Sequence, residues 1–339
     1  MIAMELRSPG PVATGRRLTR VERPDPVPGP GEVLIAVSTC AVCRTDLQIV
    51  EGDLVARRLP IVPGHQVVGR ITAIGDGVDP RHCPVGQRVG VAWTAGCCGT
   101  CRFCTAGREN LCPDLAFTGW DRDGGFATAM TARADFVHPM PAGFDDLDAA
   151  PLLCGGTIGY RSLHVAGVDL AHAAGIRLGL YGFGASATIV IQLAVHAGVE
   201  VYVATRSRAE QQAARQLGAI WAGGYGQLPP VPLDAAITFA PSGDVVVAAL
   251  TAVDRGGIVA INAIHLDRIP QFDYDLLWLE RSLRSVANVT RQDVAEFLEL
   301  AAAIPIRTRT EVFGLAEADT ALARLFVGQV SGAAVLAVG

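Results

Sequence analysis

The stretch LGLYGFGASATIVIQLAVHAGV, residues 178–199, carries no formally charged residue, and this restricts what the chain can fold into. A run of this length and polarity is long enough to be weighed as a transmembrane helix. Its glycines at positions 179, 182 and 184, together with Gln192 and His196, argue against a membrane span. A buried strand, a glycine turn and a helix explain the run better, so the sequence predicts an α/β unit here.

The glycine turn in this unit has the spacing G-x-G-x-x-A, formed by Gly182, Gly184 and Ala187. The apolar LGLY precedes it, and a helix that ends near Gly198 leads to a second apolar strand, VEVYVA. In this context small residues let the backbone approach a pyrophosphate at a helix N-terminus, which predicts a dinucleotide site. A tight turn in an ordinary α/β unit is the alternative. The later segments LDAAITFA and GGIVAINA, separated by DVVVAALTAV, continue the strand–helix alternation of a parallel sheet.

Composition excludes some classes of function. The chain has 339 residues, half of them apolar, which is enough for about two domains. Its net charge of -5 provides no basic field for nucleic acid. The start, MIAMELRSPGPV, lacks the basic flank and apolar core of a signal peptide, so we expect a cytoplasmic protein. In that reducing compartment, clustered cysteines more often hold metal or do chemistry than form disulfides.

The stretch CCGTCRFCTAGRENLC, residues 97–112, holds five of the nine cysteines. Four of them follow the spacing C-x2-C-x2-C-x7-C: Cys98, Cys101, Cys104 and Cys112. This spacing is typical of a closed tetrahedral zinc site, which leaves no position for substrate. An iron–sulfur cluster also uses four cysteines, and the spacing alone does not exclude it. Cys97 is left over as a bystander thiol.

Three further candidates are widely spaced along the chain: Cys43 in CAVCRTD, His65 in VPGHQVVG and Cys154 in PLLCGGTIGY. Each alone fits a buried or hydrogen-bonded core residue. Together they supply two thiolates and an imidazole, which is a zinc ligand set with an open fourth position.

The chain resembles the zinc-containing medium-chain alcohol dehydrogenases over nearly its whole length. The matching stretches are PGEVLIAV, CAVCRTD, VPGHQVVG, GQRVGV, the four-cysteine loop, DGGFA, PLLCGGTIGYRSL, YGFGASA and AEADTALARLFVGQVSGAAVL. The resemblance implies an α/β protein with a GroES-like, β-rich catalytic domain formed by residues 1–153 and 290–339. Residues 154–289 are expected to form a Rossmann domain with a doubly wound parallel sheet.

This resemblance assigns roles to single residues. Cys43, His65 and Cys154 would hold a catalytic zinc, in addition to the zinc of the four-cysteine loop, which makes two per chain. Thr45 matches the hydroxyl that hydrogen-bonds the substrate oxygen and passes on its proton. Asp46 matches the carboxylate that accepts from the other nitrogen of the zinc histidine. The implied activity is hydride transfer between a nicotinamide cofactor and an alcohol or aldehyde.

The chain departs from the family at two positions. Gln66 stands where a glutamate usually follows the zinc histidine, and a neutral amide is a weaker ligand. Gln48 stands where relatives often have the histidine that ends the proton relay, and glutamine does not titrate. Trp93 and Trp120 are expected to line an apolar substrate pocket that favours aliphatic or aromatic alcohols and aldehydes, with ordinary core packing as the alternative.

The end of the second Rossmann strand predicts the choice of cofactor. NAD enzymes of this fold carry an acidic side chain there, which accepts from the adenosine ribose. The chain has Thr205 at this position, followed closely by Arg206 and Arg208, whose guanidinium groups suit a 2′-phosphate. We therefore expect NADP(H) to be preferred. The full set of expected cofactor residues is Gly182, Gly184, Ala185, Ala187, Thr205, Arg206 and Arg208.

Two other functions compete with this interpretation. One is a zinc-free quinone or enone reductase of the same superfamily, against which the Cys43–His65–Cys154 set argues. The other is a non-enzymatic, zinc-stabilised nucleotide-binding redox sensor, against which Thr45 and the open ligand position argue. The stretch LRSVANVT resembles the edge strand through which the family's dimers pair, so we expect a homodimer or homotetramer.

Overall fold

The computed structural model describes residues 1–263 and 266–339, and there the chain forms two compact units. Unit 1 comprises Met1–Cys154, Asn288–Ala302 and Arg307–Gly339. Unit 2 comprises Gly155–Ala287 and Ala303–Ile306. Compact units are groups of residues in contact, whereas domains are parts that can fold by themselves. The domain boundaries expected near residues 153 and 290 therefore stay a prediction.

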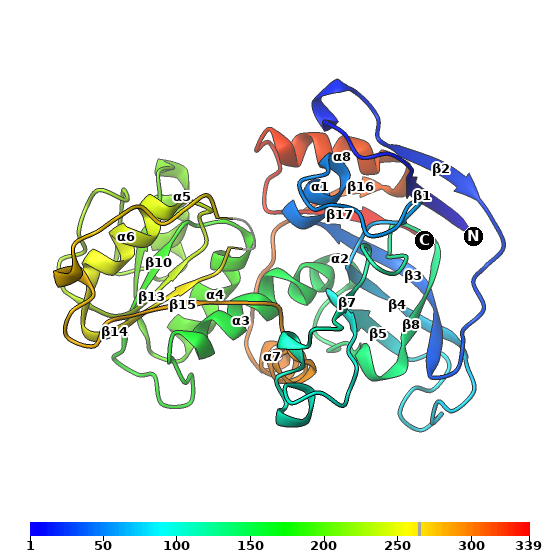
Figure 1. Ribbon diagram of the computed structural model, residues 1–339, viewed down its shortest axis with the longest axis horizontal. Coiled ribbons are helices and arrows are strands. Elements are labelled where there is room, and N and C mark those ends of the chain that lie inside the picture. Colours follow the sequence, from blue (N-terminus) through cyan, green and yellow to red (C-terminus); the bar gives the residue numbers. More distant parts are fainter. Residues whose placement is uncertain (264–265) are drawn as a thin grey trace. The chain divides into compact units, whose positions relative to one another are not determined.

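Unit 1 is built on a mostly antiparallel sheet (Figure 1). The sheet follows the order β16 (Thr310–Gly314), β17 (Ala333–Ala337), β3 (Glu32–Val42), β4 (Gln66–Ile74), β5 (Arg88–Val91) and β9 (Val137–Pro139), with β8 (Ala129–Arg133) also paired to β3. Two smaller sheets pair β1 (Ile2–Leu6) with β2 (Leu18–Glu22), and β6 (Thr94–Gly96) with β7 (Ala116–Phe117). The helices are α1 (Arg44–Glu51), α2 (Asp146–Ala149), α7 (Arg291–Ala303) and α8 (Ala318–Phe326), and the 3-10 turn η5 (Ala150–Leu153) follows α2.

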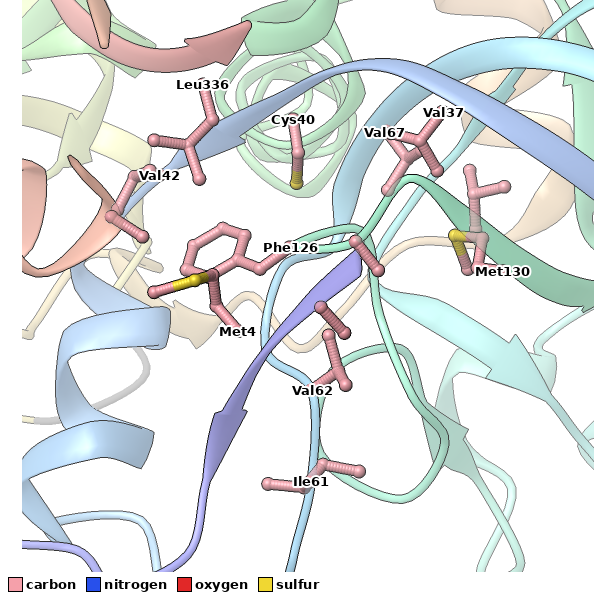
Figure 2. Close-up of a cluster of buried hydrophobic side chains, with 14 of the residues drawn as sticks. Met4, Val37, Cys40, Val42, Ile61, Val62, Val67, Phe126, Met130 and Leu336 are labelled. Atoms are coloured by element: carbon pink, nitrogen blue, oxygen red, sulfur yellow. The ribbon is translucent and has the colours of Figure 1, made fainter. Parts of the chain in front are cut away.

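The core of unit 1 supports the segment that carries His65. Figure 2 shows Phe126 within this core, near Met4, Cys40 and Val42. Gly64, with φ at +100°, packs so closely that an added Cβ would lie 2.5 Å from the Phe126 ring and 2.8 Å from Cys40 Sγ. Only glycine fits this contact and this backbone conformation, so the core holds the residue before His65 in one place.

Unit 2 is built on a parallel sheet (Figure 1). Its order is β12 (Trp221–Gly223), β11 (Glu200–Ala204), β10 (Arg177–Tyr181), β13 (Leu233–Thr238), β14 (Val253–Ile261) and β15 (Ser282–Ser285). The helices are α3 (Gly155–Val165), α4 (Ala185–His196), α5 (Arg208–Gln216) and α6 (Gly243–Ala252). The strand order reverses at β10, and right-handed crossovers on either side of it place α4 and α6 on opposite faces. This is the predicted doubly wound Rossmann sheet.

The uncharged stretch at residues 178–199 consists of most of β10, a glycine turn and α4 with the turn that follows it. The strand is buried between β11 and β13, which explains why it carries no charged residue. In the described ranges, no helix has the length and apolar character needed to cross a bilayer.

The predicted edge strand is shorter than the stretch LRSVANVT. It covers Ser282–Ser285 and lies at one edge of the unit 2 sheet, paired in parallel with β14. One side of β15 therefore has no strand partner within the described chain, and pairing across a two-fold axis stays a prediction.

Candidate active site

Three elements far apart in the sequence bring Cys43, His65 and Cys154 together. Cys43 is the N-cap of α1, directly after β3, and His65 directly precedes β4. Since β3 and β4 are antiparallel and Ala41 pairs with Gln66, the end of one strand meets the start of the other. Cys154 follows η5, which packs against β4. The Sγ atoms and a ring nitrogen of the three residues all lie within 4.8 Å of one another.

The spacing of these atoms fits a tetrahedral zinc ion. Cys43 Sγ lies 3.4 Å from His65 Nε2. Zinc bond lengths of about 2.3 Å to sulfur and about 2.0 Å to nitrogen give about 3.5 Å between two ligands at the tetrahedral angle. Only three such side chains are grouped here in the described chain, so a fourth position is left for another ligand.

Asp46 orients His65. The Asp46 side chain is fully buried, and its Oδ1 lies 3.0 Å from His65 Nδ1. The same carboxylate accepts from the backbone N–H of Cys43 at 2.8 Å and of Gly64 at 3.2 Å. With Nδ1 donating to Asp46, the imidazole presents Nε2 toward Cys43, which is the nitrogen a metal ion at this centre needs.

Without a metal ion this centre retains protons. A hydrogen bond with Cys154, and then burial, raise the pKa of Cys43 well above its ordinary value. Burial by itself lowers the pKa of His65, but the charges of Asp46 and Cys43 outweigh burial and raise that pKa to about 10. A divalent cation has the opposite effect on such groups, because it replaces the protons and stabilises thiolate and neutral imidazole.

Thr45 and Gln48 lie on α1 next to this centre. The backbone N–H of Thr45 donates to Cys43 Sγ at 3.4 Å, so this residue is held against the first ligand. Within residues 1–263 and 266–339 the Thr45 hydroxyl has no hydrogen-bond partner, although the residue is buried. Gln48 is half-buried one turn further along the helix.

Gln66, the residue after His65, is buried, and its Nε2 atom makes no hydrogen bond in the described chain. A buried amide donor without a partner is unusual.

An aromatic stack extends from the metal centre. The edge of His65 meets Trp93, with ring centroids 4.8 Å apart, and Trp93 stacks on Phe117 at 4.7 Å. Trp120 lies 6.0 Å from Trp93 and 5.6 Å from Phe117, so both predicted tryptophans belong to one cluster. The Arg57 guanidinium lies over the Trp120 ring, with its Cζ atom 4.2 Å from the ring centroid. Sequence reasoning missed Phe117 and Arg57, which lie outside the quoted motifs and join the stack only through the β6–β7 pairing and a loop.

The four remaining predicted ligands form a second cluster. Strands β6 and β7 bracket the loop, so its two ends are hydrogen-bonded to each other. Cys98 Sγ lies 3.9 Å from Cys104 Sγ and 3.5 Å from Cys112 Sγ. Cys101 Sγ lies 3.6 Å from Cys104 Sγ. Four thiolates around one zinc ion lie about 3.8 Å apart, whereas disulfide sulfurs lie about 2.05 Å apart. The cysteines here are unpaired thiols with metal-site spacing.

The four-cysteine loop is also attached to the N-terminus of α7. The backbone N–H of Arg291 and its guanidinium donate to Glu109 at 2.9 and 3.2 Å. The Asn288 side chain donates to the backbone oxygen of Asn110 at 3.2 Å. The loop thereby holds the segment in which the chain re-enters unit 1.

In unit 2 the glycine turn connects β10 to α4. Gly182, with φ at +96°, has a backbone conformation that disfavours a side chain, and an added Cβ would lie 3.0 Å from Ala240 N. Gly184 is the N-cap of α4, and an added Cβ there would meet only open space. Ala185 opens the helix and Ala187 is fully buried against the sheet. A bare backbone at a helix N-terminus fits a pyrophosphate.

At the end of β11 the structure places Thr205 directly after the strand, buried, with Arg206 and Arg208 exposed. Neither arginine has an ion-pair partner in the part of the chain that the structure describes. The structure adds Glu210, whose carboxylate accepts a hydrogen bond from the Thr205 hydroxyl. Sequence reasoning missed Glu210 because it lies within a helix, five residues beyond the strand-end position.

Comparisons with known proteins show which family the chain is similar to. The model of the alcohol dehydrogenase GroES-like domain matches residues 29–142. A "Probable alcohol dehydrogenase" of Mycobacterium tuberculosis is 48% identical over 340 residues, covering 99% of this chain and 97% of its own length. An alcohol dehydrogenase of Geobacillus stearothermophilus is 32% identical over 315 residues, with 90% and 91% covered.

The solved structures support the same fold. A cinnamyl alcohol dehydrogenase from Sorghum bicolor superposes with a TM-score of 0.87 at 24% identity, covering 99% of this chain and 97% of that one. The predicted combination of a GroES-like domain and a Rossmann sheet is thus confirmed. The chain belongs to the zinc-containing medium-chain alcohol dehydrogenase family and is an oxidoreductase of the alcohol dehydrogenase type.

Proposed function

We propose that this alcohol dehydrogenase is zinc-dependent, prefers NADP(H), and interconverts apolar alcohols with their aldehydes. The observation that carries the proposal is the Cys43–His65–Cys154 set, whose ligand atoms lie within 4.8 Å of one another while leaving a fourth position. Asp46 supports it by presenting His65 Nε2 to that centre. The cluster of four thiols supports a second, structural zinc ion.

Cys43, His65 and Cys154 would hold a zinc ion, which would supply Lewis-acid polarisation of the substrate oxygen, and the nicotinamide cofactor would supply or accept the hydride. The Thr45 hydroxyl hydrogen-bonds that oxygen and relays the proton when an alcohol is oxidised to an aldehyde, accepting the alcohol proton while it donates its own onward. Asp46 holds the Nδ1 proton of His65 throughout. Gln48 does not titrate, so the proton leaves Thr45 through water.

The aromatic stack supports an apolar substrate. Trp93 is only 9% exposed and packs against His65 with the two ring planes at 72°, so it excludes water on one side of the metal centre. The stack offers the ring faces and edges of three aromatic side chains, which suit an apolar substrate. Aliphatic and aromatic alcohols or aldehydes are the proposed substrates, and Trp93 and Trp120 the proposed pocket residues.

The preference for NADP(H) rests on Arg206 and Arg208 and on the absence of an acid at position 205. A charge-assisted hydrogen bond contributes roughly 1.5 to 3 kcal/mol, so one or two contacts favour NADPH by about tenfold to several hundredfold. The Gly182–Ala187 turn would hold the pyrophosphate. A higher kcat/KM with NADH than with NADPH would refute the preference.

Metal analysis tests the zinc assignment and separates the alternatives. A dehydrogenase with both centres occupied holds about two zinc ions per chain. A zinc-free enone reductase holds none, and a protein with one zinc ion and no turnover would be a nucleotide-binding redox sensor. We further propose a cytoplasmic homodimer or homotetramer, supported by the exposed edge at β15.

A further inference from the structure

The helix that follows the second Rossmann strand uses its glutamate in an unusual way. Ser207 is the N-cap of α5, and its hydroxyl accepts from the backbone N–H of Glu210 at 3.3 Å. In the common capping box, a glutamate at this position reaches back to the backbone N–H of the N-cap residue. The Glu210 carboxylate instead accepts from the hydroxyl of Thr205, two residues before the N-cap. The negative charge therefore lies at the end of β11 rather than at the helix terminus.

The surrounding contacts hold this carboxylate in place. Gln211 Nε2 donates to the backbone oxygen of Thr205 at 2.8 Å. Thr205 is buried, and both its hydroxyl and its backbone oxygen are hydrogen-bonded to side chains of α5. Glu210 is half-buried, and its Oε1 has no hydrogen-bond partner in the described part of the chain. One carboxylate oxygen is thus fixed while the other remains available as an acceptor.

This position matters because nucleotides bind at the carboxyl ends of parallel strands. At the end of the second strand, an acid accepts from the ribose hydroxyls of NAD(H) and repels the 2′-phosphate of NADP(H). The sequence has Thr205 where that acid is expected, but the structure places the Glu210 carboxylate one hydrogen bond away from Thr205 Oγ1. The carboxylate that position 205 lacks is therefore supplied by Glu210, which lies beside Thr205 in the fold.

We propose that Glu210 is a specificity-determining residue for the nicotinamide cofactor. Its free carboxylate oxygen accepts from the 2′-hydroxyl of NAD(H), and its charge opposes the 2′-phosphate of NADP(H), which Arg206 attracts. The chain consequently uses both cofactors, and Glu210 keeps the preference for NADP(H) at the lower end of the expected range. The inference rests on the proposed function, because it requires nicotinamide binding at this strand end.

The test measures the binding of adenosine fragments to the intact, zinc-loaded protein by calorimetry at fixed ionic strength. The ligands are 2′,5′-ADP and 5′-AMP, which differ only in the 2′-phosphate, and the readout is the ratio of their affinities. Glu210→Gln is expected to raise this ratio roughly tenfold in favour of 2′,5′-ADP, and Arg206→Ala to lower it by a similar factor. Neither result depends on turnover.

A matched control is Glu317→Gln. The Glu317 carboxylate accepts from the backbone N–H of Gly314 at 2.7 Å in unit 1, so the same substitution there removes one negative charge outside the Rossmann sheet. The ratio is expected to stay at the wild-type value. Glu210→Asp provides a second variant at the site, because it keeps the charge but is too short to reach Thr205. Its ratio is expected to lie between those of wild type and Glu210→Gln.

The outcomes separate the two proposals. If Glu210 only stabilises α5, Glu210→Gln weakens both ligands by the same factor and leaves the ratio unchanged, which overturns the inference while the proposed function stands. If the wild-type protein holds zinc but binds neither fragment nor either nicotinamide cofactor, the proposed function fails as well. A ratio that rises in Glu210→Gln and not in Glu317→Gln supports the role of Glu210.

Discussion

The substitution Asp46→Asn tests how the metal centre is held. The carboxylate accepts three hydrogen bonds, from His65 Nδ1 and from the backbone N–H groups of Cys43 and Gly64. Asparagine keeps one acceptor oxygen and turns the other into a donor, so at least one buried N–H loses its acceptor. A buried donor without a partner costs about 1 to 3 kcal/mol. We therefore expect zinc affinity at this centre to fall roughly tenfold to a hundredfold.

The measurement is zinc retention under competition with a chelator, together with kcat for an alcohol substrate. The four-cysteine centre should keep its zinc in the variant, so the content falls from about two toward about one ion per chain. Asp169→Asn is the control, because Asp169 pairs with His172 at 2.9 Å on the surface and the same change there should alter neither readout. Unchanged zinc affinity and kcat in Asp46→Asn would refute the role of the carboxylate.

Four further predictions follow from the site and the fold. Cys101→Ser should lower the stability and yield of the protein far more than it lowers the turnover of the protein that survives. Cys154→Ser should leave the fold intact and abolish turnover. A Cys101→Ser variant that is as stable as wild type but inactive would show that the structural and catalytic sites have been assigned the wrong way round. Gln48→His should introduce a transition near pH 6 to 7 in the pH dependence of the rate of alcohol oxidation, since an unperturbed imidazole titrates at about 6.5. An unchanged pH–rate profile would show that position 48 is not on the proton path. Burial, and then the Arg291 charge, lower the pKa of His138 to about 4, so the unfolded chain alone gains this proton as pH falls below about 6.5. Stability should therefore decline by about 3 kcal/mol between pH 6.5 and 4, and His138→Gln should flatten that part of the denaturation profile. Pairing through β15 predicts a dimer or larger assembly, and a monomer in light scattering at micromolar concentration would contradict it.

Features that depend on neighbouring residues could be predicted from the sequence. The run LGLYGFGASA contains a strand, a turn and a helix start in order, because alternation, glycine and helix propensity act over a few residues. The four-cysteine spacing is equally local, since one short loop bracketed by β6 and β7 supplies all four thiols. In both places the chemistry and the residues that perform it lie in one segment.

The catalytic set was predicted through the resemblance rather than through local pattern. Cys43, His65 and Cys154 converge because β3 pairs with β4 and because η5 packs against β4, and neither contact has a sequence signature near the ligands. The stacking of Phe117 on Trp93 and the cover of Arg57 on Trp120 arise in the same way, from a sheet pairing and a loop.

Glu210 marks the limit of what the sequence determined by itself. The sequence correctly placed Thr205 at the end of the second strand, because this depends on residues a few positions apart. Sequence reasoning missed Glu210, which lies on the helix that follows. Whether the Glu210 side chain turns to the N-cap or to Thr205 depends on the burial of Thr205 beside Tyr225 and Gln211, which only the folded sheet creates. The tertiary structure therefore decided the charge at the proposed ribose site, since side-chain direction is set by packing between segments that the chain separates.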